Sequence, residues 1–159
     1  MILLHILATA LLFSPAAAEV PSAAVFGFEL DDTSLQGEMQ GPAAADRARL
    51  ARLDAQLLES LARSGRYAPF AAADPAGPAL RNCGGCETAT ARRLGAQVAI
   101  TGWVQKVSNL ILNINLVVRD VASGRRLAAG SVDIRGDTDD SWTRGLAYLL
   151  RNRILASAP

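Results

Sequence analysis

The residues best suited to chemistry are Cys83 and Cys86, which are the only cysteines in the chain. Two glycines separate them in the segment RNCGGCE, residues 81–87. A CxxC pair can carry out thiol–disulfide exchange, supply half of a zinc site, or close a small structural ring. The compartment and the neighbouring residues decide between these chemistries.

Four observations favour a structural disulfide between Cys83 and Cys86. An oxidising compartment favours the bond, and the two glycines let the backbone close the ring. A thioredoxin-like site usually follows a buried strand directly, whereas AGPALRN precedes this pair. A zinc site needs two more ligands, and the sequence has no second CxxC. Thiol exchange is the alternative, because a cysteine near a helix N-terminus has a stabilised thiolate.

The single histidine, His5, lies in the N-terminal apolar segment. A mature chain without His5 has no Ser-His-Asp or Cys-His arrangement and no histidine metal ligand. It also lacks the side chain that most often acts as a general base near neutral pH. We therefore expect a protein that is not an enzyme and that uses neither a metal nor a cofactor.

Residues 1–18 predict a signal peptide. The apolar run from Ile2 to Phe13 is followed by small residues that end at Ala18 and match an A-x-A cleavage site. The run is shorter than the roughly 20 residues that a membrane-spanning helix needs, although an uncleaved anchor is an alternative. We expect cleavage near Ala18, a periplasmic location, no stable membrane span, and one domain over residues 19–159.

The charges of the chain nearly balance, with 16 Lys plus Arg against 15 Asp plus Glu. Without a basic excess, we expect no nucleic-acid partner. Two groups of acids follow the first and last predicted strands, and they could gather around Ca²⁺ if those strand ends were neighbours. Their spacing does not fit an EF-hand loop, so we favour acids in turns and at a helix N-terminus. These acids are Glu29, Asp31, Asp32, Glu38, Asp133, Asp137, Asp139 and Asp140.

The hydrophobic pattern predicts a β-α-β-α-β-β-β-α order. Strands are expected at residues 23–30, 66–70, 97–104, 110–121 and 125–136. Helices are expected at residues 43–63, at residues 86–94 and from about residue 137 onward. Pro69 restricts the second strand to a sheet edge, and residues 35–42, with their two glycines, are expected to form a loop.

This order indicates an α/β (α+β) fold with a single mixed sheet. Strands separated by helices form a parallel βαβ part, and the closing run of strands forms a C-terminal antiparallel meander. The helices are expected to pack on this sheet.

Polar side chains gather in the predicted hairpin between the third and fourth strands. Asparagine is a poor strand residue, so two of them within one strand indicate something specific to hydrogen-bond. The partner could be a ligand, another protein, or a nearby loop of the same chain. The candidate recognition surface consists of Trp103, Gln105, Lys106, Ser108, Asn109, Asn113 and Asn115.

Three stretches together resemble a known fold. AVFGFELDDTS (residues 24–34), RRLGAQVAITGWVQ (92–105) and LVVRDVASGRRL (116–127) resemble steps of the N-terminal domain of TolB and related periplasmic domains. Over nearly the whole mature length, and above all in GWVQKVSNLILNINLVVRDV (102–121), the chain is similar to a family of small secreted proteobacterial proteins of unknown function. The resemblance implies an exported α/β domain that binds or scaffolds something, and it brings no catalytic residues.

The combined interpretation is a non-enzymatic periplasmic accessory or binding protein that engages a periplasmic protein partner through its sheet and polar hairpin. One alternative is a periplasmic thiol–disulfide factor that acts through Cys83 and Cys86. Another alternative is a sensor of a small ligand.

The reduction potential of Cys83 and Cys86, measured on protein isolated from the exported fraction, separates the first two interpretations. A stable disulfide with a potential below about −300 mV would mean a structural ring. A labile bond or free thiols would make residues 81–87 an active site.

Overall fold

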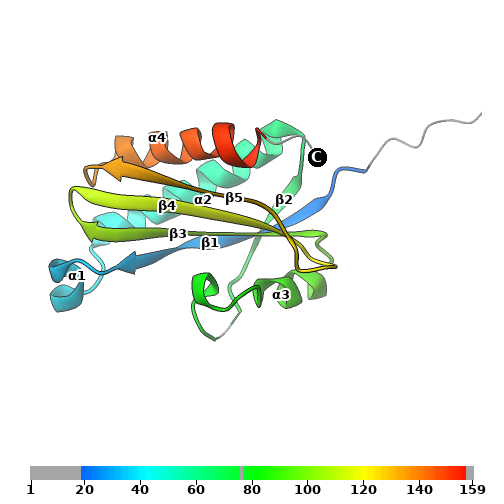
Figure 1. The fold of residues 1–159 in the computed structure, drawn as a ribbon, viewed down its shortest axis with the longest axis horizontal. Coiled ribbons are helices and arrows are strands. Elements are labelled where there is room, and N and C mark those ends of the chain that lie inside the picture. The colour runs from blue at the N-terminus through cyan, green and yellow to red at the C-terminus, as the bar shows by residue number, and fades with distance from the viewer. Residues whose placement is uncertain (1–18, 76, 157–159) are drawn as a thin grey trace, which may run out of the picture.

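The computed structural model describes residues 19–75 and 77–156, so the predicted signal segment lies outside the described residues. One five-stranded sheet has the order β2-β1-β3-β4-β5 (Figure 1). Strand β1 pairs in parallel with β2 and β3, and the pairs β3–β4 and β4–β5 are antiparallel. The predicted fold class is confirmed. The strands are β1 (Ser22–Asp32), β2 (Ala68–Ala72), β3 (Val98–Ser108), β4 (Ile111–Asp120) and β5 (Arg126–Arg135).

Helices cover the two faces of the sheet unequally (Figure 1). Helices α2 (Ala44–Ser64) and α4 (Asp139–Leu149) lie on one face, and a π-helical turn, η2 (Leu150–Ile154), continues α4. Of the described elements, α3 (Glu87–Arg93) and a short 3₁₀ turn, η1 (Leu80–Asn82), pack on the other face. None of the helices among the described residues is long and apolar enough to cross a membrane.

The larger core lies under α2 and α4 because both helices bury a leucine-rich stripe. In α2, Leu53, Leu57 and Leu61 recur every four residues and are fully buried. Alternate β4 residues, from Leu112 to Val118, point from the sheet toward these helices and pack against them in the same core. The smaller core, under α3 and η1, contains Ala24, Phe26, Leu80, Ala91, Ala96, Ala99 and Val121.

The predicted loop at residues 35–42 is wrong, because a helix, α1 (Leu35–Gln40), occupies this stretch. The Ser34 hydroxyl accepts a hydrogen bond from the Gly37 N–H and so caps the helix, while it donates to Asp32. A Cβ at position 37 would collide with the Asp32 carboxylate, so the cap requires glycine there. Glycine lowers helix propensity, and for this reason the pattern resembled a loop.

A buried ion network joins the layers at one end of the larger core. The Lys106 ammonium lies 2.7 Å from both the Asp46 and the Asp137 carboxylates, and only 4% of the Lys106 side chain is exposed. Arg49 bridges the same two carboxylates at 2.9 Å each. The Trp142 indole N–H donates to Asp137. The network therefore connects β3, the start of α2 and the start of α4.

Charge pairing outweighs burial at Lys106. Burial alone would lower the pKa of the ammonium, but hydrogen bonds with Asp137 and Asp46 raise the pKa above its ordinary value. Lys106 therefore stays charged inside the fold.

Replacing Lys106 with Met should lower the free energy of unfolding by about 3–5 kcal/mol, because Asp46 would be left as a buried, poorly compensated charge. Arg63→Ala is the control, since it removes an exposed pair with Glu59 and should cost less than about 1 kcal/mol. Equilibrium urea unfolding measures both. Equal losses in the two variants would show that the network is not a main support of the fold.

Candidate functional site

Beyond α3 and η1, this side of the sheet carries no helix formed by residues 19–75 or 77–156. Cross-strand register places Trp103 opposite Asn115 and Gln105 opposite Asn113. On β5, Ser131 and Asp133 continue the same rows. We call this surface the open face; it consists of Trp103, Gln105, Asn113, Asn115, Ser131 and Asp133, none of which is buried.

The structure brings together four of the seven predicted recognition residues: Trp103, Gln105, Asn113 and Asn115. Ser108 ends β3 and Asn109 follows it in the turn, at the border of the open face. Lys106 does not belong to this surface, because side chains alternate along a strand and residue 106 points toward α2 and α4. Proximity in sequence had grouped residues that lie on opposite sides of the sheet.

Some polar side chains of the open face form hydrogen bonds within the described chain, and others do not. The Asn113 amide donates to Asp133 at 2.7 Å and accepts from Ser131 at 2.9 Å, so it has a local structural role. Among the described residues, the side chains of Trp103, Gln105 and Asn115 have no hydrogen-bond partner. These three side chains are therefore the part of the surface best placed to bind something else.

An apolar group lies at the end of the sheet next to the open face. Helix α1 and the β3–β4 turn are at this same end (Figure 1). They carry the most exposed large hydrophobic side chains of the described residues: Leu35 (73%), Met39 (74%) and Leu110 (72%). Sequence analysis missed this apolar end, because the helical spacing of Leu35 and Met39 has no meaning in an expected loop.

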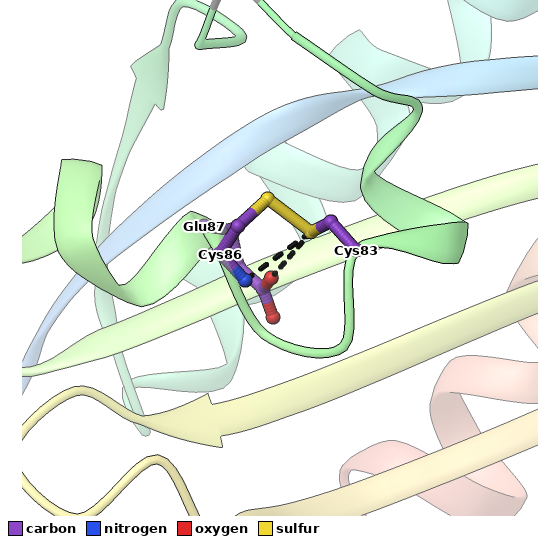
Figure 2. A group of neighbouring side chains, drawn as sticks. All are labelled: Cys83, Cys86 and Glu87. Carbon is purple, nitrogen blue, oxygen red and sulfur yellow. Dashed lines mark hydrogen bonds between the residues drawn. A yellow bond between two sulfur atoms is a disulfide. The ribbon is translucent and has the colours of Figure 1, made fainter.

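The two cysteines form a disulfide in the loop between η1 and α3, with 5.5 Å between their Cα atoms (Figure 2). The adjacent Glu87 side chain is buried and accepts a hydrogen bond from Arg119 of β4 at 2.9 Å. The two sulfurs and a Glu87 carboxylate oxygen lie within 4.8 Å of one another. Thiolates are the form in which cysteine binds metals, so a metal ion would require this disulfide to be reduced first.

Within residues 19–75 and 77–156, the two groups of acids do not gather into a joint cation site. Glu29 and Asp31 both bind the Arg81 guanidinium at 3.0 Å. Asp137, from the second group, is bound to Lys106 and Arg49. Cationic side chains compensate the charges of these three acids, and Glu29 and Asp31 anchor η1 to β1.

Asp54 of α2 has a role that the sequence did not indicate. It is half-buried and accepts a hydrogen bond from the Phe28 N–H at 2.7 Å. This N–H lies where β1 bulges, just beyond its last pairing with β2 at Phe26. A cavity of about 190 Å³ adjoins this point and is lined by Gly27 and Asp54 among others.

Two carboxylates near this edge have perturbed pKa values. Burial raises the pKa of Asp54, and the hydrogen bond from Phe28 opposes this only in part. The pKa of Asp74 is raised by burial and by the negative charges of Glu29 and Asp54. No motif marks these two residues, since Asp54 comes from α2 and Asp74 from the segment after β2.

Similarity to known proteins agrees with this architecture. The family model DUF3280, described as "Protein of unknown function (DUF2380)", matches residues 21–154, which confirms the predicted membership of a family of unknown function. No curated protein sequence matches this chain.

Solved structures with a similar fold include the PelC dodecamer from Paraburkholderia phytofirmans, with a TM-score of 0.58 and 15% identity over 91% of this chain and 94% of PelC. The C-terminal domain of LpoB from Salmonella enterica has a TM-score of 0.52 and 14% identity, over 77% of this chain and 87% of that chain. TolB from Acinetobacter baumannii has a TM-score of 0.46 and 13% identity, over 85% of this chain and 30% of TolB. At such identities, the PelC and LpoB similarities show the fold alone.

The raised pKa of Asp54 predicts a pH-dependent effect of Asp54→Asn. The folded state binds the proton of Asp54 more tightly than the unfolded state, whose pKa is near 3.8. The carboxylate is therefore least favourable to folding near neutral pH, and its contribution improves as the pH falls through the raised pKa. The stability of Asp54→Asn relative to the natural protein should be highest near neutral pH and decrease toward pH 4, by urea unfolding. If the stability difference between Asp54→Asn and the natural protein did not change with pH, this would contradict the raised pKa of Asp54.

Proposed function

We propose that this chain, which belongs to the DUF3280 family of proteins of unknown function, is an exported accessory protein that binds a protein partner through its open face. The unequal covering of the sheet is the observation that carries the proposal. Helices α2 and α4 close one face. Part of the other face is covered by no helix of the described residues and displays Trp103, Gln105 and Asn115. In the described part of the chain, no other group forms a hydrogen bond with the polar groups of these three side chains.

The chemistry of this end of the molecule suits a protein partner. An aromatic side chain beside unused amides offers both apolar contact and hydrogen bonds, which is typical of protein interfaces. The exposed Leu35, Met39 and Leu110 extend the surface with apolar contacts. Within the described residues, the outer edge of β5 pairs with no strand, so an extended segment of a partner can add to it.

In this proposal, the protein acts in the periplasm by binding its partner and not as an enzyme. Residues 1–18 are removed, and residues 19–159 form a single domain. The predicted loss of His5 and the lack of a nucleophile–base pair on the open face support a binding role. PelC forms a dodecamer, so self-association of this chain is an outcome that any binding experiment must separate from a different partner.

A small-ligand sensor is the second candidate, and one cavity favours it. This cavity of about 530 Å³ lies at the opposite end of the sheet from α1 and is within the usual size range of ligand pockets. Its lining includes Arg66, Tyr67 and Leu127. Thermal stabilisation by a metabolite, lost in Tyr67→Ala, would favour this function over partner binding.

Replacing Gln105 and Asn115 together by Ala should reduce recovery of the partner at least tenfold, because the amides at the centre of the surface are lost. Stability should change by less than about 0.5 kcal/mol, since these amides make no hydrogen bond within the described chain. The measurement is quantitative mass spectrometry of proteins that co-purify with the tagged, full-length chain from the exported fraction.

Glu59→Ala is the matched control, because Glu59 is exposed on α2, on the opposite side of the sheet. It should leave recovery unchanged. Equal recovery with all three proteins, or no specific partner with any of them, would count against the proposal. Light scattering on the purified chain identifies self-association.

A further inference from the structure

The Glu87 carboxylate is buried beside the disulfide in an unbalanced environment. Only 3% of its side chain is exposed. One oxygen, Oε1, accepts a hydrogen bond from the Arg119 Nε–H at 2.9 Å. The other, Oε2, faces the Cys83 sulfur at 3.7 Å (Figure 2).

The oxidised cysteine pair cannot satisfy Oε2. A disulfide sulfur carries no hydrogen, and no N–H or O–H group of the described residues donates to this oxygen. Buried carboxylate oxygens normally accept hydrogen bonds, and a buried acceptor without a donor is unfavourable. A reduced Cys83 would supply the missing donor, because its S–H group would point at Oε2 from the same position.

We propose that Cys83 and Cys86 form a thiol–disulfide exchange site, in which Glu87 favours the reduced state by accepting the hydrogen bond of the Cys83 thiol. The proposal is independent of partner binding at the open face. It assigns to Glu87 a positioning and tuning role, since this carboxylate acts through the sulfur and forms no bond with the reductant.

The contacts of the loop indicate which sulfur leaves first. The Cys86 N–H donates to the Cys83 sulfur at 3.2 Å, which stabilises negative charge on Cys83 during bond cleavage. Both cysteines are partly exposed, and a cavity of about 110 Å³, lined by Gly84, Glu87 and Trp103 among others, adjoins the loop. An external thiol can therefore approach.

In the proposed reaction, one thiolate of a dithiol reductant attacks the Cys86 sulfur and the Cys83–Cys86 bond breaks. The bonding electron pair goes to Cys83, which takes a proton from water. The new S–H group of Cys83 then donates a hydrogen bond to Glu87. The second thiolate of the reductant then displaces Cys86, which also takes a proton. The dithiol leaves as a disulfide, and two electrons have reduced the cysteine pair.

Redox equilibration of the full-length exported protein with dithiothreitol, read by alkylation and mass spectrometry, tests the proposal. The natural protein should have a potential above about −300 mV, the upper range of structural disulfides. Glu87→Gln should make the disulfide about tenfold harder to reduce, which corresponds to about 30 mV. The variant loses the charged acceptor of the thiol, and its amide can donate to the disulfide sulfur.

The direction in which the reduction potential of Glu87→Gln changes separates the proposed role of Glu87 from simple support of the loop. A loosened fold would hold the sulfurs together less well and would make the disulfide easier to reduce. Glu29→Gln is the control, because Glu29 anchors the same loop through Leu80 and Arg81 without contacting sulfur. It should leave the potential unchanged or raise it.

A potential of the natural protein below about −300 mV, or a Glu87→Gln potential that is unchanged or higher, would overturn the proposal. If circular dichroism shows that Glu87→Gln is unfolded, Glu87→Asp replaces it, since the shorter side chain withdraws the carboxylate from sulfur. The same decrease is expected for that variant, and its absence would equally refute the role of Glu87.

Discussion

The buried ammonium of Lys106 is the constraint on which the arrangement of this molecule depends. It lies at the end of β3 and pairs with one carboxylate from α2 and another from the turn before α4. A charge removed from water in this way is stable only when both partners stay in place. The network therefore holds α2 and α4 on the same face of the sheet, above the larger core.

One-sided covering has a functional consequence on the other face. Helix α3 and η1 close only the end where small side chains such as Ala24 and Ala99 leave room for them. The remaining half is the open face, with its unused amides and a tryptophan. The disulfide loop lies at the border between the covered and open halves, where Glu87 and Arg119 connect α3 to β4. The proposed binding surface and the proposed exchange site are thus neighbours in space.

Much of this architecture could be predicted from periodicity. The leucine spacing of α2, the alternation of β4 and the proline in β2 each follow from local geometry, and the elements form as expected. Features that depend on contacts between distant residues could not be predicted. The cap that makes α1 helical needs Asp32 beside Gly37, and Lys106 looked like a surface residue until Asp46 and Asp137 were placed around it.

The candidate site shows the same difference between features set by local sequence and features set by contacts between distant residues. The CxxC spacing indicated the disulfide, but no sequence pattern indicated that the Glu87 carboxylate, from the first turn of α3, lies beside it. The strand pattern grouped the amides of the hairpin, yet only the register showed that Asn113 is satisfied by Asp133 whereas Asn115 is not. Local patterns identify candidate residues, and tertiary contacts decide which of them can act.

Site-specific photocrosslinking in the exported protein tests the central claim, that the open face is the partner interface, most directly. A photoreactive amino acid is placed at position 115 on the open face or at position 59 on the exposed side of α2. We expect one discrete crosslinked product of higher mass from position 115 and none from position 59. Crosslinks from position 59 alone, or the same products from both positions, would contradict the claim.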